Sequence, residues 1–246
     1  MRLSILIPAQ NEENNILGAV LGVMKVVEEE AINYEIIVIN DHSTDRTELI
    51  LNRLTQKYPH IKYVNNSKPN GFGLAIQKGL ECFTGDAAII FMADGSDNPE
   101  DIVKYYQMFQ KGYACVFGSR FIKGSKVENC PIHKLILNRF ANYFIKALFC
   151  IDHNDITNAF KGYRREVINN LKPFLSHDFN INVELPLKAV VRRYSYAIVP
   201  ISWFGRKRGV TKFKIREMGI QYLFIIFYIF FERFFLKKVI SGAGYR

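Results

Sequence analysis

The stretch IIFMADGSDNPED, residues 89–101, is an apolar run that ends in two acids, a glycine, a serine and a proline. Burying a charge without a partner is costly, so Asp94 and Asp97 should lie where the apolar run leaves the core. At such a point a carboxylate stays hydrated or meets a cation. The stretch therefore predicts a buried strand that ends at a polar site.

The first ninety residues repeat this pattern, alternating apolar runs with longer helical patterns. The runs are LSILIPA (3–9), YEIIVIND (34–41), IKYVNN (61–66) and AAIIFMAD (87–94), and the helical patterns cover residues 14–30, 44–58 and 73–83. Runs that are apolar throughout and separated by helices are typical of parallel strands buried on both faces. The sequence thus predicts an α/β protein that begins as a doubly wound, Rossmann-like sheet.

Polar clusters follow three of these runs, at residues 10–12, 40–43 and 94–97. Ligands of open α/β sheets bind outside the carboxyl ends of the strands, so we expect the three clusters to converge on one crevice. The alternative for Asp97 and Asn98 is that they cap the helix that begins near Pro99.

The second half continues with a mixed pattern. Strands are expected over 114–121 and 196–204, helices over 134–149 and 180–193, a short strand leading into a helix over 155–167, and a basic loop over 205–214. At 246 residues and 49% hydrophobic content, the chain can bury a sizeable core. We expect one catalytic domain over residues 1–215 and a tail over 216–246.

The formal charge of +10 is unevenly placed. From residue 188 onward there are 13 Lys and Arg against two Glu, so the first 187 residues together carry a charge of about −1. The same last quarter holds the most apolar run, YLFIIFYIFF (222–231). Basic and aromatic residues in one segment favour an anionic membrane surface as partner over nucleic acid.

The apolar part of that tail is short. Residues 218–231 are 14 residues broken only by Gln221, whereas a membrane-spanning helix needs about 20 apolar residues. The segment predicts an interfacial amphipathic helix or one packed in a dimer, with a tilted or paired span as the alternative and a homo-oligomer left open. Lys237 and Lys238 would meet lipid headgroups.

Cysteine and histidine usage argues against zinc. The four cysteines and five histidines lack metal-ligand spacing, and the first apolar run is too short for a signal peptide. We expect a reduced, cytoplasmic catalytic domain.

Eight motifs follow one another along the chain: IPAQNE, VINDHSTDRT, GFGLAIQKGL, MADGSDNPED, GSRFIKG, NRFAN, DITNAFKGYRREV and GRKRGVTKFK. In this order they resemble family 2 glycosyltransferases of the GT-A fold, and most of all the polyprenyl-phosphate sugar synthases such as dolichol-phosphate mannose synthases. The resemblance covers about residues 3–215. It implies a mostly parallel mixed sheet flanked by helices. It also implies inverting, metal-dependent transfer of a sugar from a UDP- or GDP-linked donor to a polyprenyl phosphate at the cytoplasmic membrane face, with the protein peripheral or anchored by its C-terminus.

The resemblance also implies a donor site. Carried over residue by residue, its nucleotide-binding positions are Pro8, Asn11, Glu12, Asp41, Gly71 and Gly73. Glycines allow close backbone approach, although such a pair is also common in simple turns. The alternative for the carboxylate at position 41 is a turn or cap at the start of the following helix.

The implied metal site departs from the family pattern. The two aspartates of the family's D-x-D motif, aligned on the proline that follows, fall on Ala93 and Gly95, and the acids here are Asp94 and Asp97. Mg²⁺ or Mn²⁺ takes oxygen ligands from one or two carboxylates and the substrate phosphates. We expect Asp94 to hold the metal with Asp97 or Ser96.

Cationic residues complete the expected site. Arg120 and Arg139 match family arginines near the phosphates, and a guanidinium binds phosphate bidentately. Lys161 stands where the family commonly has arginine, in a loop that Asp155 and Thr157 would help to order.

The basic loop matches a further family motif through Arg206, Gly209, Thr211 and Lys212. Such a loop can cradle a phosphate. Because a phosphate monoester is already ionised at neutral pH, its attack needs no general base.

Two other functions remain open at the level of sequence. A family 2 enzyme that glycosylates a hydroxyl would need a carboxylate base, for which Asp97, Asp155 and Glu184 are the candidates. A non-catalytic nucleotide-binding or membrane-scaffold protein is the other alternative, prompted by the altered D-x-D motif.

Overall fold

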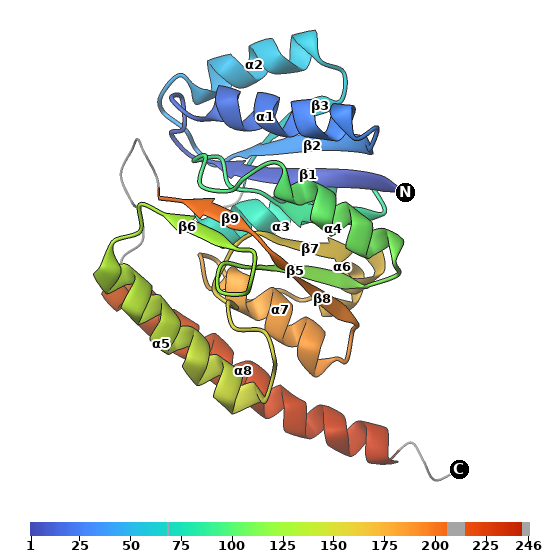
Figure 1. The fold of residues 1–246 in the computed structure, drawn as a ribbon, viewed down its shortest axis with the longest axis vertical. Coiled ribbons are helices and arrows are strands. Elements are labelled where there is room, and N and C mark those ends of the chain that lie inside the picture. The colour runs from blue at the N-terminus through green and yellow to red at the C-terminus, as the bar shows by residue number, and fades with distance from the viewer. Residues whose placement is uncertain (68, 206–214, 243–246) are drawn as a thin grey trace.

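The computed structural model describes residues 1–67, 69–205 and 215–242. Its centre is a seven-stranded sheet in the order β3-β2-β1-β4-β7-β5-β8 (Figure 1). The strands are β1 (Arg2–Ala9), β2 (Asn33–Asn40), β3 (Ile61–Asn65), β4 (Ala87–Ile90), β5 (Cys115–Ser119), β7 (Lys161–Arg164) and β8 (Tyr196–Pro200). The neighbouring strands run parallel except at β7, which is antiparallel to both β4 and β5. The predicted mostly parallel mixed sheet is confirmed.

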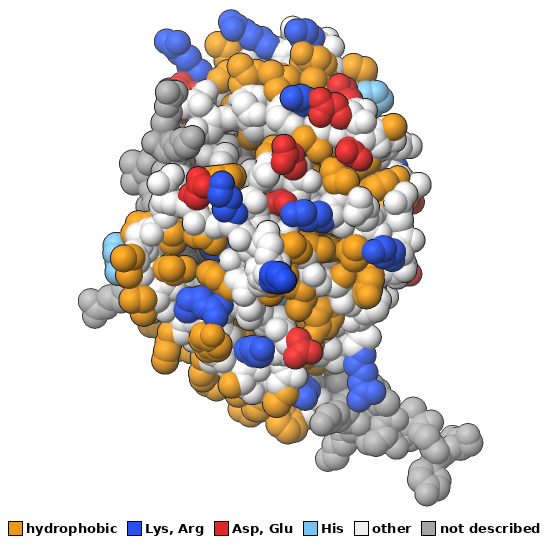
Figure 2. All heavy atoms as spheres, in the orientation of Figure 1, with side chains coloured by type: hydrophobic (Ala, Val, Ile, Leu, Met, Phe, Trp, Pro, Cys, Tyr) orange, Lys and Arg blue, Asp and Glu red, His pale blue; other side chains and the backbone are white. Residues whose placement is uncertain are grey.

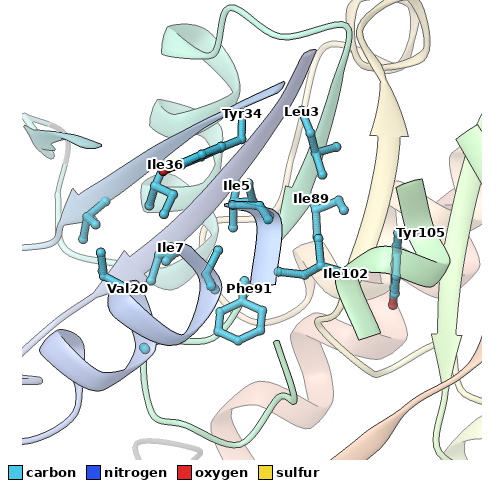
Figure 3. Close-up of a cluster of buried hydrophobic side chains, with 14 of the residues drawn as sticks. Leu3, Ile5, Ile7, Val20, Tyr34, Ile36, Ile89, Phe91, Ile102 and Tyr105 are labelled. Carbon is cyan, nitrogen blue, oxygen red and sulfur yellow. The ribbon is translucent and has the colours of Figure 1, made fainter. Parts of the chain in front are cut away.

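Helices cover both faces of this sheet. Leu3, Ile5 and Ile7 of β1 pack toward the layer formed by α1 (Ile16–Glu29), α2 (Thr47–Lys57) and α4 (Asp101–Gln110), and Figure 3 shows this core. Leu6 faces the opposite layer, formed by α3 (Phe72–Cys82), α6 (Arg165–Leu171) and α7 (Ile181–Val191). Burial on both faces explains why the strands are apolar throughout rather than alternating.

A third core joins two long helices to this body. In α5 (Ile132–Phe149) and α8 (Ile215–Gly242), Ile145, Phe149, Ile225 and Ile229 pack with Leu187 of α7. Figure 1 shows α5 and α8 side by side at the end of the molecule away from α1 and α2. In the part of the chain that the structure describes, no helix is both long and apolar enough to cross a bilayer.

The expected strand over residues 196–204 is divided between two sheets. β8 ends at Pro200, and β9 (Ser202–Phe204) pairs with β6 (Lys126–Glu128) in a separate two-stranded sheet. The division occurs at Ile201, whose N–H donates to Ser119 O while its carbonyl accepts from Lys126 N. Residues 206–214 of the predicted basic loop lie outside the described residues.

Candidate active site

The carboxyl ends of β1 and β2 are interlocked. Asn11 N donates to Ser43 Oγ at 3.0 Å, and Thr44 N donates to Asn11 Oδ1 at 2.8 Å. Asn11 and His42 both have left-handed backbone angles, with φ of 54° and 56°. Such angles are strained in residues other than glycine and cluster at functional sites. The structure thus brings together two of the three predicted polar clusters.

Asp41 is the centre of this region and is only 4% exposed. Its carboxylate accepts from Asn66 Nδ2 at 2.8 Å and from Gly71 N at 3.1 Å, and His42 Nδ1 lies 3.2 Å away. Asp41 therefore does not cap the following helix. Asp45, which lies before the N-cap residue Arg46, supports the start of α2 instead, because its Oδ1 accepts from Thr47 N at 2.9 Å.

Pro8 and Glu12 have local structural contacts. Pro8 is buried in β1, opposite Ile39 of β2. The Glu12 carbonyl accepts from the backbone of Asn15 and Ile16, and its carboxylate accepts from Asn15 Nδ2 at 2.8 Å. These contacts place Glu12 at the turn that begins α1.

Gly71 and Gly73 do provide close backbone approach, but to the chain itself. A Cβ at Gly71 would lie 2.4 Å from His177 O, and one at Gly73 would lie 2.5 Å from Ser176 O. The first turn of α3 is therefore seated directly on residues 176–178.

The acidic loop after β4 holds two carboxylates in different surroundings. Asp94 is half-buried, and its Oδ1 accepts from Ser96 N at 3.0 Å. Asp97 is 3% exposed and accepts from Met92 N at 3.1 Å. The turn before α4 is supported by Asn98, whose Oδ1 accepts from Glu100 N at 3.3 Å, so the capping alternative applies to Asn98 but not to Asp97.

Strand β9 fixes this loop from the other side. Phe204 N donates to Ser96 O at 2.8 Å, and Trp203 forms an antiparallel bridge with Asp97. β9 ends directly before the basic segment. Two distant parts of the chain, the acidic loop and the entry to the basic loop, therefore meet at one place.

The electrostatics of the acidic loop suit a divalent cation. Burial raises the pKa of Asp97 to about 7, and the charge of Asp94 adds to this effect, while Arg120 opposes it. Two carboxylates whose negative charges act on each other fit a Mg²⁺ or Mn²⁺ ion that takes its other ligands from a substrate. Among the described residues no group of three His, Cys, Asp or Glu side chains is arranged to hold a metal.

Arg120 is clamped by Asp155. Its Nε and Nη2 donate to the two carboxylate oxygens at 2.8 and 2.7 Å, and its backbone N–H donates to Oδ2 at 2.9 Å. Burial alone would raise the pKa of Asp155, but the guanidinium holds that pKa below its usual range. The pair fixes Arg120 near Asp97 and makes Asp155 unsuited to accept a proton.

Arg139 lies on α5 between two aromatic rings. Its guanidinium carbon is 4.3 Å from the ring centre of Phe121 and 4.6 Å from that of Tyr143. Arg120 lies 5.2 Å from the same Phe121 ring and 5.7 Å from that of Trp203. The two arginines expected near the phosphates are thus both packed against one phenylalanine.

Comparison with known proteins assigns the chain to a family. The model of glycosyl transferase family 2 matches residues 4–172. The chain belongs to glycosyl transferase family 2.

Relatives of this family 2 glycosyltransferase match most of its length. A dolichol-phosphate mannosyltransferase of Pyrococcus furiosus is 32% identical over 87% of the chain, which spans only 60% of that relative's length. A polyprenol monophosphomannose synthase of Mycolicibacterium smegmatis is 28% identical over 89% of this chain and 88% of its own.

Solved structures share the fold. Glucosyl-3-phosphoglycerate synthase from Mycobacterium tuberculosis in complex with UDP matches with a TM-score of 0.70 at 17% identity, over 93% of this chain and 79% of that one. A second structure of that enzyme, with Mn²⁺, UDP and phosphoglyceric acid, matches at 0.69 and 16% identity, over 93% and 78% of the two chains. The predicted GT-A fold and family are confirmed.

In this family 2 chain, Lys161 is directed onto the backbone of its own loop. Its buried ammonium donates to Ile156 O at 2.8 Å and to Asn158 O. Burial lowers the pKa of Lys161 to about 7, an effect that the charge of Asp155 opposes. Lys161 therefore orders the loop that carries Asp155 and Thr157.

Glu184 is likewise tied into the scaffold. Its fully buried carboxylate accepts from the backbone N–H groups of Leu175 and Ser176 and pairs with Lys188. Of the three candidate bases named from the sequence, Asp97 is the one whose carboxylate is not engaged by a cationic side chain at hydrogen-bond distance among the described residues.

Three further parts of the site were missed at the level of sequence. Asn66, which follows β3, could have been found by the same rule of polar residues at strand ends. Trp203 is the single tryptophan of the chain, and nothing else in the sequence around it indicated a role in the site. The segment 176–178 offered no local signal, because its role depends on glycines about a hundred residues away.

Proposed function

We propose that the protein is an inverting glycosyltransferase that moves a sugar from a UDP- or GDP-linked donor to a polyprenyl phosphate at the cytoplasmic face of a membrane. The observation that carries this proposal is the layout of the carboxyl edge of the sheet. A buried carboxylate with neutral hydrogen-bond donors, Asp41, lies after β2. After β4 lie Asp94 and Asp97, and the charges of Asp94 and Arg120 both act on Asp97. The names of the two relatives support a polyprenyl-phosphate acceptor.

Donor binding is assigned to the Asp41 region. A buried carboxylate can accept hydrogen bonds from a base or ribose, and its own position is held by Asn66 and Gly71. Asn11 lies beside it through Ser43 and Thr44. Pro8, Glu12 and Gly73 are the other positions proposed for the donor site, and each also supports the local fold.

Metal binding is assigned to Asp94, Asp97 and Ser96, with Mg²⁺ or Mn²⁺ as the ion. When bound, the ion would neutralise the charge that develops on the departing nucleoside diphosphate. Asp94 is the more accessible carboxylate, and Asp97 supports it from the buried side.

The acceptor is held by cations in this proposal. Acceptor phosphate and donor diphosphate repel each other, so the site must supply positive charge to bring them together. Arg139 and Arg120 supply part of it, and Arg206 and Lys212 are proposed to supply the rest. A phosphate oxygen then forms the bond to the anomeric carbon as the bond to the diphosphate breaks, which inverts the sugar's configuration.

The membrane surface is assigned to exposed apolar side chains of α5 and α8. Figure 2 shows hydrophobic side chains gathered over α5 along the lower edge of the molecule. The apolar face, as we call it, comprises Ile132, Ile136, Leu137, Phe140, Tyr143 and Phe144 of α5, with Ile220, Leu223, Phe224, Phe227, Tyr228, Phe231, Phe234 and Phe235 of α8. Exposed large apolar side chains gathered on neighbouring helices are typical of an interaction surface. Arg139 lies on α5 among these residues, which supports placing the acceptor phosphate at the membrane surface.

The test is a screen of radiolabelled nucleotide sugars against a short polyprenyl phosphate and the matching polyprenol, with product extracted into organic solvent. We expect transfer to the phosphate and not to the alcohol. Equal transfer to the alcohol, abolished by Asp97→Asn, would instead support the hydroxyl-acceptor function, which the raised pKa of Asp97 favours. Absence of UDP and GDP binding, with or without Mn²⁺, would refute both enzyme functions and leave the membrane-scaffold alternative.

A further inference from the structure

Segment 173–180 connects the second half of the chain to the Asp41 region. Leu74 N donates to His177 O at 3.2 Å, and Gln77 Nε2 donates to Ser176 O at 2.8 Å. With the close contacts at Gly71 and Gly73, these bonds fix the first turns of α3 on the segment. Gly71 N in turn donates to Asp41.

The segment is itself held from α7. Leu175 N and Ser176 N donate to the Glu184 carboxylate at 2.8 and 2.7 Å, and Lys188 Nζ donates to Pro173 O at 2.6 Å. These contacts fix the first half of the segment. Its second half, around Phe179, is held by contacts with α3 and α8.

Phe179 lies between α3 and α8. Its ring stacks on Phe72 of α3, with centroids 4.3 Å apart and planes 7° from parallel. Its carbonyl accepts a hydrogen bond from Tyr222 Oη of α8 at 2.9 Å. The Tyr222 hydroxyl is enclosed, and burial raises its pKa, with a further contribution from Asp178.

Segment 173–180 also interacts with the donor region through the charges of Asp178 and Asp41. Burial raises the pKa of Asp178, and the charge of Asp41 adds to that effect. Asp178, next to Phe179, therefore lies close enough to Asp41 for their charges to interact. Asp41 is thus linked to this region twice, by the hydrogen bond from Gly71 N and by its charge interaction with Asp178.

We propose that Tyr222 is a positioning residue for the donor site: through Phe179 and segment 173–180, it holds the first turn of α3 and Asp41 in the nucleotide-binding arrangement. The proposal rests on the donor site proposed above. Helix α8 thus has a second role besides its apolar face, because it contributes directly to the geometry of a site that is formed by the first half of the chain.

The test compares Tyr222→Phe with Tyr113→Phe in the full chain. Both changes remove one hydroxyl, but Tyr113 is 37% exposed and lies between α4 and β5, outside every site proposed above. Binding of UDP and GDP with Mn²⁺ is measured by titration calorimetry, and donor KM, acceptor KM and kcat are measured with the active sugar nucleotide. We expect Tyr222→Phe to weaken nucleotide binding and raise donor KM about fivefold or more, with acceptor KM and kcat little changed. Tyr113→Phe should match the wild type.

Equal donor affinity in the two variants would overturn the proposal. It would also be overturned if Tyr222→Phe raised donor KM and acceptor KM by the same factor. If Tyr222→Phe fails to fold, Phe72→Leu tests the same connection from α3 and should also raise donor KM selectively. A wild-type protein that binds neither nucleotide would refute the proposed function itself, which is a separate outcome.

Discussion

Two buried aspartates at the same sheet edge differ in what surrounds them. Asp41 accepts hydrogen bonds from an amide and a backbone N–H, whereas Asp97 accepts from Met92 N and faces the charge of Asp94. Neutral donors stabilise a carboxylate, and a like charge in a dry site destabilises it. The first environment suits a neutral hydroxyl or amide of a nucleoside, and the second suits a cation.

This difference predicts how stability depends on pH in metal-free protein. The pKa of Asp97 is about 7 when folded, against 3.8 as its ordinary value. The native state therefore binds more protons between these values, so this group lowers stability as pH rises from about 4 to about 7, by up to about 4 kcal/mol. Denaturant unfolding in chelator, measured across this range, should show the loss in wild type, and Asp97→Asn should lack it.

Two controls accompany that measurement. Asp94→Asn removes the neighbouring charge, so the loss of stability should move to lower pH. Mn²⁺ should stabilise wild type more at pH 8 than at pH 5, because it binds the ionised form. If the unfolding free energy of Asp97→Asn depended on pH as that of the wild type does, Asp97 would not titrate in this range.

At the scale of elements, α5 and α8 combine a buried side with an exposed apolar side. Ile145 and Phe149 of α5 and Ile225 and Ile229 of α8 are buried in the third core. Phe140 and Ile220 are each 73% exposed. Deleting the tail would therefore uncover Leu187 and its neighbours while leaving the exposed side of α5 in place, so point substitutions test membrane binding more cleanly.

The double variant Phe140→Ser with Phe224→Ser should bind anionic vesicles at least about tenfold more weakly than wild type, because burying one such side chain contributes about 1.5–3 kcal/mol. Flotation or sedimentation with vesicles containing phosphatidylserine measures this. Leu49→Ser on α2 is the control, since Leu49 is 51% exposed at the other end of the molecule. Unchanged vesicle binding in the double variant would place the membrane contact elsewhere.

At the scale of the whole molecule, the two halves of the chain meet at backbone contact distance. The first turn of α3 and residues 176–178 touch where a side chain would not fit. Interiors are close-packed, so an added methyl group there must displace backbone. The donor region is thus a product of both halves, and stability and nucleotide binding should change together.

Gly73→Ala tests this. The new Cβ would lie 2.5 Å from Ser176 O and 2.7 Å from His177 C, and we expect a loss of about 1–3 kcal/mol in unfolding free energy with weaker nucleotide binding. Gly18→Ala in α1 is the matched control, because nothing lies within 4 Å of the position that its new methyl group would take. That change should stabilise the protein by about 0.5–1 kcal/mol. Similar effects of both substitutions, in urea unfolding and calorimetry, would contradict the close contact.

The sequence by itself determined the doubly wound order of β1 to β4, the positions of the helices between them and the polar strand ends. These features follow from local patterns: a short apolar run, a helical period, and a polar residue where a run stops. For the same reason Asn11, Asp41 and Asp94 could be placed at one edge before any contact was known, because parallel strands share the direction of their ends.

Only the tertiary structure decided what each of these residues touches. It paired Arg120 with Asp155, turned Lys161 onto backbone carbonyls, divided residues 196–204 between two sheets, and seated Gly73 on residues 176–178. None of these contacts is local in sequence except that of Lys161. A side chain's partner depends on which distant segment packs beside it, and packing is set by the shape of the whole core rather than by the residues on either side in the chain.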